Sequence, residues 1–416
     1  MLALTLFLFW TVIAIVAVSY AVFFIFLCRL RQIEWTRPTE EFLPKTLVLF
    51  PLRGADPSLT QSLEKVLTQD YPNYHVRFIL DSADDSALPF VDSAIKQWGA
   101  QHSDIKIMTE HFSTCSLKCS AHLAGMADLD PSFEVIAVLD ADTNPPKDWL
   151  KRLVEPLADP RFPAATGLRW YIPDRANPGS LVRYLWNAAA IVMQYLYRIP
   201  WGGSMALRRE LFVKTDLLEQ WKHAFTDDSS IVSAVRQAKG TIAVIPSLFL
   251  VNRETCGLAS FHRWVMRQML INKLYTPTWG AIVAQTVLIS LPLCLLIVLF
   301  LAGLVMQDGQ VAFWSALAFM LYWAGVFGTL PVMEHTIRQI VQQHGEMVEN
   351  WSFRRTVLTF AMVPITQAVY TSAMFWLHFL HRVEWRGIEY EITGKRIRMI
   401  EYKPYPTQHI EAGQSL

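Results

Sequence analysis

In this 416-residue chain the residues best placed to do chemistry together are Asp140 and Asp142, which follow a continuous apolar run at residues 135–139. The run is short and bounded by polar residues, which is typical of a buried strand in a parallel sheet. Ligands bind beyond the carboxyl ends of such strands, where side-chain alternation can aim two carboxylates at one point. Mg²⁺ is usually bound by one or two carboxylates together with substrate phosphates. Asp-x-Asp is also frequent as a solvated turn, so the motif alone leaves both interpretations open.

An α/β domain must position these acids, and residues 43–255 have the matching pattern of short apolar runs alternating with polar, helix-like segments. We expect strands at the following positions: 46–50, 76–80, 105–108, 135–139 and 241–245. The second of these ends on a cluster of three acids, Asp81, Asp84 and Asp85. The carboxyl ends of at least two strands therefore carry carboxylates.

Three further features of this domain each have a functional and a plain structural interpretation. Lys118 lies in a loop before a small-residue helix and could neutralise a phosphate or be a surface charge. The glycine pair ending in Gly203 allows a ligand to approach the backbone closely, or forms an ordinary turn. Asp227 and Asp228 stand where a loop meets a helix, where aspartate also serves as a cap.

The composition indicates a membrane protein, because 52% of the residues are hydrophobic and the mean hydropathy is +0.25. Residues 1–28 carry no charge and are followed by Arg29 and Arg31. This is longer than the roughly 20 residues that span a bilayer. We therefore predict a transmembrane anchor at residues 1–30 and, by the positive-inside rule, a cytoplasmic domain after it. The net charge of +1 gives no support for a nucleic-acid partner.

The carboxy-terminal part follows as an amphipathic interface helix at residues 256–277, a transmembrane region at 278–381 and a cytoplasmic tail at 382–416. The interface helix carries Trp264, Arg267 and Gln268 on adjoining parts of one face, so it could rest on lipid and bring a cation to a phosphate. Residues 278–307 and 310–333 are long enough to span. Residues 356–381 have basic flanks on both sides and contain Pro364, which favours a re-entrant segment or a broken helical hairpin and leaves the number of spans open. The tail begins with a short predicted strand at 386–392.

The order of these motifs resembles a family 2-type membrane glycosyltransferase, most closely the ceramide glucosyltransferase family. The resemblance covers nearly the whole chain from residue 43 and rests on these residues: Pro51-Leu52-Arg53-Gly54-Ala55-Asp56-Pro57-Ser58-Leu59, Gln69-Asp70-Tyr71-Pro72-Asn73-Tyr74, Ala83-Asp84-Asp85, Lys118, Asp140, Gly203-Ser204-Met205, Asp227-Asp228 and Trp385-Arg386-Gly387. It implies a GT-A, Rossmann-like domain that binds a nucleotide sugar, with transmembrane helices at both ends.

The resemblance also implies a role for each candidate residue. Asp228 would be the general base of an inverting transfer, and Asp140 and Asp142 would hold Mg²⁺ or Mn²⁺. The donor-binding residues would be Asp81, Asp84, Asp85, Lys118, Asp140 and Arg267, and which of the first three contacts the nucleotide stays open. The acceptor or product side would consist of Gly203, Asp227, Trp264 and Gln268.

The chain also departs from the family pattern. The family's Gln/Arg-x-x-Arg-Trp motif aligns with residues 264–268, or in another register with Arg263-Trp264, and we prefer the former. Asp142 completes an Asp-x-Asp that the animal ceramide enzymes lack, and residues 184–197 contain none of their histidines.

The expected function is transfer of a hexose, most simply glucose from UDP-glucose, to the hydroxyl of a membrane lipid at the cytoplasmic face of a bacterial cytoplasmic membrane. The acceptor is ceramide-like, diacylglycerol or a hopanoid or sterol-like lipid, and protein partners are unknown. Two other functions are compatible with the same fold. A polysaccharide synthase needs a channel of many spans, and only three or four candidates follow the domain. A catalytically inactive membrane scaffold would not need the acids that this chain retains.

Overall fold

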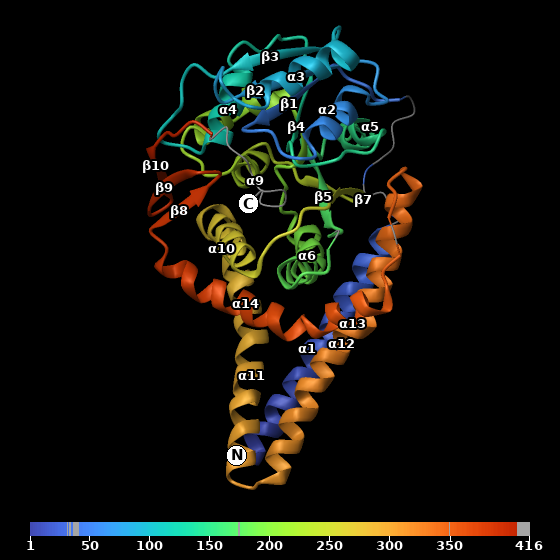
Figure 1. Ribbon diagram of the computed structural model, residues 1–416, viewed down its shortest axis with the longest axis vertical. Coiled ribbons are helices and arrows are strands. Elements are labelled where there is room, and N and C mark those ends of the chain that lie inside the picture. The colour runs from blue at the N-terminus through green and yellow to red at the C-terminus, as the bar shows by residue number, and fades with distance from the viewer. Residues whose placement is uncertain (31, 33–34, 36–40, 174, 349, 406–416) are drawn as a thin grey trace.

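The computed structural model describes residues 1–416 except 31, 33–34, 36–40, 174, 349 and 406–416. An α/β domain stands on a stem of three long helices, with shorter helices between the two (Figure 1). The stem helices are α1 (Leu2–Arg29), α11 (Trp279–Val305) and α12 (Gly309–Gln343). The amino terminus and the α11–α12 connection lie together at the far end of the stem, away from the α/β domain (Figure 1).

The domain contains a seven-stranded mixed sheet of order β3-β2-β1-β4-β6-β5-β7. Its strands are β1 (Thr46–Leu52), β2 (Tyr74–Leu80), β3 (Ser103–Ile107), β4 (Val135–Leu139), β5 (Ala164–Tyr171), β6 (Ser204–Arg208) and β7 (Ile242–Asn252). β6 is antiparallel to both of its neighbours, and the other adjacent strands are parallel. Every residue of β4 is buried, which explains its continuous apolar run.

Side chains alternate between two hydrophobic cores, one on each face of the sheet. In β1, Leu47 and Leu49 enter one core, whereas Val48 and Phe50 enter the other. The helices of the domain are α2 (Leu59–Leu67), α3 (Leu88–Ala94), α4 (Leu117–Met126), α5 (Trp149–Val154), α7 (Arg209–Lys214), α8 (Leu217–Trp221) and α9 (Asp227–Gln237). The α/β fold class expected from the sequence is confirmed. β5 and β6, which the sequence pattern did not reveal, complete the sheet.

Two helices lie between the sheet and the stem: α6 (Pro178–Tyr197) and α10 (Leu258–Tyr275). α10 corresponds to the expected interface helix. α6 was not expected, because its hydrophobic positions are interrupted by polar side chains such as Asn187 and Gln194. Asn177 caps α6 by accepting a hydrogen bond from the amide of Ser180 at 2.8 Å.

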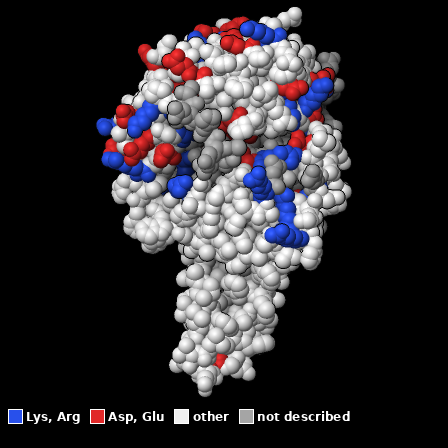
Figure 2. Space-filling model, viewed as in Figure 1, with Lys and Arg blue, Asp and Glu red and all other residues white. Residues whose placement is uncertain are grey.

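Among the described residues, three individual helices are long and apolar enough to cross a membrane, and they are the stem helices. Figure 2 shows lysine, arginine and acidic side chains over the α/β domain and an almost uncharged stem. The third apolar stretch is a pair of helices, α13 (Phe353–Ala361) and α14 (Val363–Trp376), bent by 40° at the break between them. Arg355 at its start donates a hydrogen bond to the carbonyl of Pro173 in the α/β domain. The expected break near Pro364 is therefore present, and the pair runs beneath the domain rather than down the stem (Figure 1).

A second, antiparallel sheet follows α14 and packs on the α/β domain. Its strands are β8 (Arg382–Trp385), β9 (Ile388–Thr393) and β10 (Arg396–Glu401), where the sequence suggested one strand. The amide of Met399 donates to the carbonyl of Ser113 at 2.7 Å, and the hydroxyl of Tyr390 accepts from the amide of Leu117 at 3.1 Å. This segment is thus part of the surface of the α/β domain, and residues 406–416 of the expected tail lie outside the described residues.

Candidate active site

A cavity of 1170 Å³ begins at the carboxyl ends of β1, β2 and β4 and continues between the helices of the stem. Its upper part is polar, and its lower part is lined by α1, α6, α11, α12 and α14. Most of the candidate residues border it: Asp81, Lys118, Asp140, Asp142, Gly203, Asp227, Asp228, Trp264, Arg267 and Gln268. Asp84 and Asp85 do not line it.

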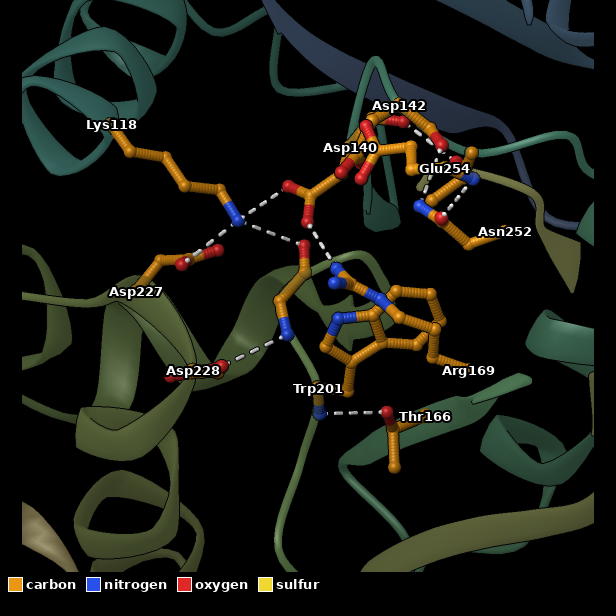
Figure 3. Close-up of polar contacts among 12 residues, drawn as sticks. Lys118, Asp140, Asp142, Thr166, Arg169, Trp201, Asp227, Asp228, Asn252 and Glu254 are labelled. Carbon is orange, nitrogen blue, oxygen red and sulfur yellow. Dashed lines mark hydrogen bonds and ion pairs between the residues drawn. The ribbon is translucent and has the colours of Figure 1, made fainter. Parts of the chain in front are cut away.

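Lys118, in the first turn of α4, connects the acids of the cavity (Figure 3). Its Nζ lies 2.7 Å from Oδ1 of Asp140 and 3.2 Å from Oδ1 of Asp227, and it donates to the carbonyl of Gly202 at 3.1 Å. Burial alone would lower the pKa of Lys118, but these acids raise it above its usual range, so the side chain stays charged. Lys118 is thus enclosed by these acids, with 13% of its side chain exposed, and is not a surface charge.

Asp227 and Asp228 occupy the first turn of α9, and Thr226 is the cap residue. Burial would raise the pKa of Asp227, but Lys118 and His122 lower it to about 2. Asp228 accepts a hydrogen bond from the amide of Gly202 at 3.0 Å. Burial, followed by the charge of Asp227, raises the pKa of Asp228. Neighbouring acids whose pKa values are pushed apart in this way can take different roles, one as a permanent charge and the other as a proton acceptor.

Arg169 of β5 holds the other side of Asp140 (Figure 3). Its guanidinium lies 3.4 Å from Oδ2 of Asp140, donates to the hydroxyl of Tyr171 at 2.8 Å, and is 4.6 Å from the centre of the Trp201 ring. Asp140 therefore lies between two cations, Lys118 and Arg169. This fixes its carboxylate at the carboxyl end of β4.

Asp142 carries the clearest sign of a missing partner. Its Oδ1 is buried without a hydrogen-bond partner among the described residues, and the residue borders the cavity. Burial raises the pKa of Asp142, and burial together with the charge of Asp142 raises the pKa of Glu254 to about 8. No group of three metal-ligating side chains exists within the described ranges. Two carboxylates fit an ion that takes its other ligands from phosphates and water.

The acidic cluster after β2 divides into three different environments. Asp81 is buried, pairs with Arg53 at 2.6 Å and lies 3.2 Å from His111. Asp85 accepts from the amides of Gly54 and Ala87, so it shapes the loop after β1. Asp84 is exposed. Of the three acids, Asp81 is the one that borders the cavity.

Sequence reasoning missed several residues of the site, chiefly Arg169, Trp201 and Glu254. Arg169 lies within an otherwise apolar strand, and a charged residue in such a run is a usable signal. Glu254 follows β7 in a loop whose pattern has no such signal. Trp201 directly precedes the glycine pair, and a tryptophan beside a turn has no sequence signal that indicates a role.

The fold is an α/β domain joined to helices long and apolar enough to cross a membrane, and one cavity extends from the domain into these helices. The chain belongs to Glycosyl transferase family 21, the ceramide glucosyltransferase family, whose model it matches over residues 9–397. The resemblance seen in the sequence is thereby confirmed.

Solved structures that are similar to the chain include two glycosyltransferases. One is the mannosyltransferase PcManGT from Pyrobaculum calidifontis in complex with GDP-Man and Mn²⁺, with 16% identity, a TM-score of 0.48, and coverage of 89% of this chain and 99% of that chain. The other is glucosyl-3-phosphoglycerate synthase from Mycobacterium tuberculosis in complex with Mn²⁺, UDP and glucosyl-3-phosphoglycerate, with 12% identity, a TM-score of 0.37, and coverage of 56% and 85%.

Proposed function

We propose that this protein transfers a hexose, glucose from UDP-glucose, with inversion onto the hydroxyl of a membrane lipid at the cytoplasmic face of a bacterial membrane. The observation that carries the proposal is the continuity of the cavity. Asp140 and Asp228 border its polar end, whereas Val22, Leu288 and Val326 of the stem helices border its apolar end. A lipid can place its hydroxyl among the acids while its hydrocarbon stays between the helices.

Asp228 is the proposed general base. Its carboxylate borders the cavity, and the hydrogen bond from Gly202 fixes one oxygen. Because its pKa is raised above the ordinary value, it accepts a proton more readily than a fully solvated aspartate. It would take the proton of the acceptor hydroxyl as this oxygen attacks the anomeric carbon, and the nucleoside diphosphate would leave from the opposite face. The configuration at that carbon would invert.

The leaving diphosphate requires positive charge. Asp140 and Asp142 would hold Mg²⁺ or Mn²⁺, which when bound stabilises negative charge on the phosphates. The chain itself contributes Lys118, which pairs with Asp140 and Asp227, and Arg267, which borders the same cavity. Asp81, buried beside Arg53 at the end of β2, is the proposed contact for the nucleoside.

The acceptor class follows from the lower part of the cavity. A ceramide-like lipid, diacylglycerol or a hopanoid or sterol-like lipid each combines one reactive hydroxyl with a large apolar body. The helices α1, α6, α11 and α12 together line a space that accommodates such a body. Trp264 and Gln268 of α10 border the region between the two parts and would contact the acceptor near its hydroxyl.

The test is incorporation of labelled sugar into lipid by the purified full-length protein in nanodiscs. UDP-glucose, UDP-galactose and GDP-mannose are supplied in turn with ceramide, diacylglycerol or a hopanoid, with Mg²⁺, with Mn²⁺ or with EDTA. The proposal predicts metal-dependent label in one lipid class, with UDP-glucose as the best donor. Label that remains in a water-soluble polymer would instead support a polysaccharide synthase, and no donor consumption under any condition would support an inactive scaffold.

A further inference from the structure

The turn between β8 and β9 has an unusual backbone for the residue it carries. Arg386 has φ 46° and Gly387 has φ 76°. Two successive residues with positive φ are typical of a tight hairpin turn in which asparagine or aspartate usually precedes glycine. An arginine at this position is strained, and strain of this kind concentrates at functional sites. The strained turn therefore indicates a functional role for the Arg386 side chain.

The turn places the Arg386 side chain in the catalytic cavity. Its Nη2 lies 3.1 Å from Oδ2 of Asp56, and its Nη1 donates to the carbonyl of Arg53 at 3.2 Å. The carbonyl of Arg386 accepts from Nε of Arg53 at 3.1 Å. These contacts fix the turn against the loop that follows β1. Arg386 comes from the carboxy-terminal sheet, more than 300 residues from that loop in the sequence.

The residue before it positions a second arginine. The guanidinium of Arg267 lies 5.3 Å from the centre of the Trp385 ring and borders the same cavity. None of the described residues forms an ion pair with Arg267. Burial, followed by the charges of Arg386 and Arg169, lowers the pKa of Arg267 to about 10. Two positively charged side chains that lie close together and are partly shielded from solvent favour an anion bound between them.

Asp142 indicates where that anion would lie, because a metal ion held by this carboxylate would also bind the anion. Arg386 acts electrostatically on Asp142, whose Oδ1 lacks a partner, and on Asp56. The two arginines thus share the cavity with the carboxylates that would hold a metal ion. A diphosphate suits this setting because arginine binds phosphate oxygens with two parallel hydrogen bonds, and a metal ion bridges the remaining oxygens.

We propose that Arg386 is a donor-binding residue, which together with Arg267 binds the diphosphate of the sugar nucleotide, and that Asp56 holds it in position before the donor arrives. This inference rests on the proposed function, because it takes a nucleotide sugar as the donor. It makes the carboxy-terminal sheet a part of the active site.

The opposing explanation is that Arg386 only ties the carboxy-terminal sheet to the α/β domain. Two substitutions separate the explanations, because Arg386→Gln and Asp56→Asn both break the ion pair, but only the first removes the guanidinium. If Arg386 only attaches the sheet, the two substitutions should weaken nucleotide binding equally. A diphosphate contact predicts that Asp56→Asn retains nucleotide binding, because the freed guanidinium remains available.

The experiment is calorimetric titration of the full-length protein in nanodiscs with UDP, UMP, GDP and GMP in the presence of Mg²⁺. We expect Arg386→Gln to weaken binding of the preferred diphosphate by about tenfold or more and to change binding of the monophosphate much less. Arg386→Lys restores part of the affinity. Asp56→Asn weakens diphosphate binding less than Arg386→Gln does, because the guanidinium is still present although it is no longer held in position. Thermal unfolding of each variant verifies that it is folded.

Four results would count against the proposal. Equal weakening of diphosphate and monophosphate by Arg386→Gln, or unchanged diphosphate affinity in that variant, would overturn it while leaving the proposed function intact. If Asp56→Asn binds the diphosphate as weakly as Arg386→Gln does, the role of Arg386 is only to attach the carboxy-terminal sheet to the α/β domain. A wild-type protein that binds neither UDP nor GDP would overturn the proposed function as well.

Discussion

The ammonium of Lys118 lies 2.7 Å from Oδ1 of Asp140, so the first acid of the Asp-x-Asp motif is already bound by a cation of the chain itself. Arg169 approaches the other oxygen of the same carboxylate at 3.4 Å. A divalent ion that uses Asp140 must therefore share it with Lys118 or displace it. The second acid, Asp142, has a buried oxygen without such a partner.

Lys118 is consequently expected to weaken metal binding while it supports catalysis. In Lys118→Gln, Asp140 no longer has the competing ammonium, so Mn²⁺ binds roughly fivefold more tightly, whereas turnover falls because Asp227 loses its cation. Lys118→Arg keeps the charge and retains the wild-type Mn²⁺ affinity. The measurement is Mn²⁺ binding by electron paramagnetic resonance on the purified protein. Equal or weaker Mn²⁺ binding by Lys118→Gln would mean that metal and ammonium do not compete.

The paired acids of α9 predict a specific pH dependence. Asp228 accepts a proton only when it is ionised, and its pKa in the folded protein is raised above 3.8. Activity is therefore lost as the pH falls through this raised pKa. Asp227→Asn removes the neighbouring negative charge, which lowers the pKa of Asp228 and moves the acid limb to lower pH. The pH profile of kcat for both proteins tests this, and a limb that stays in place or moves upward in Asp227→Asn would contradict it.

The cavity between the stem helices predicts a selective effect on the acceptor. Ala284 of α11 lines the cavity, whereas Val287 on the same helix is 51% exposed on its outer side and does not. Ala284→Phe fills part of the space and is expected to raise KM for the lipid severalfold while leaving KM for the nucleotide sugar unchanged. Val287→Phe adds an aromatic ring at a similar depth outside the cavity and serves as the control. Equal effects of the two variants would indicate that the lipid does not enter between these helices.

Local pattern was sufficient to predict β4 and the acids after it, because a buried parallel strand needs a continuous apolar run and its carboxyl end is the ligand-binding edge. The same reasoning located Asp81 after β2, whereas the two acids at the start of α9 were found as a pair where a loop meets a helix. It could not separate Asp81 from Asp84 and Asp85. Their difference depends on Arg53 and Gly54, which come from a neighbouring loop.

Contacts between distant segments explain what the sequence did not reveal. Arg169 reaches Asp140 because β5 is in the same sheet as β4, separated from it by the antiparallel strand β6. Arg386 reaches Asp56 through the fold of the whole carboxy-terminal region. Neither contact can be predicted from local periodicity, since the sheet order and the packing of the second sheet are properties of tertiary structure. The broken helix at Pro364 was predictable because proline removes a backbone donor locally.

The most direct test of the account is glycolipid formation by the wild-type protein and Asp228→Asn in identical nanodiscs with the same labelled nucleotide sugar and acceptor lipid. The carboxamide keeps the shape of Asp228 but takes up no proton, so we expect kcat to fall by about 10²- to 10⁴-fold with little change in KM for the donor. Asp92→Asn, at an exposed position on α3, controls for loss of an acid elsewhere. Glycolipid formed by Asp228→Asn at the wild-type rate, or no glycolipid from the wild type with any donor and acceptor, would contradict the account.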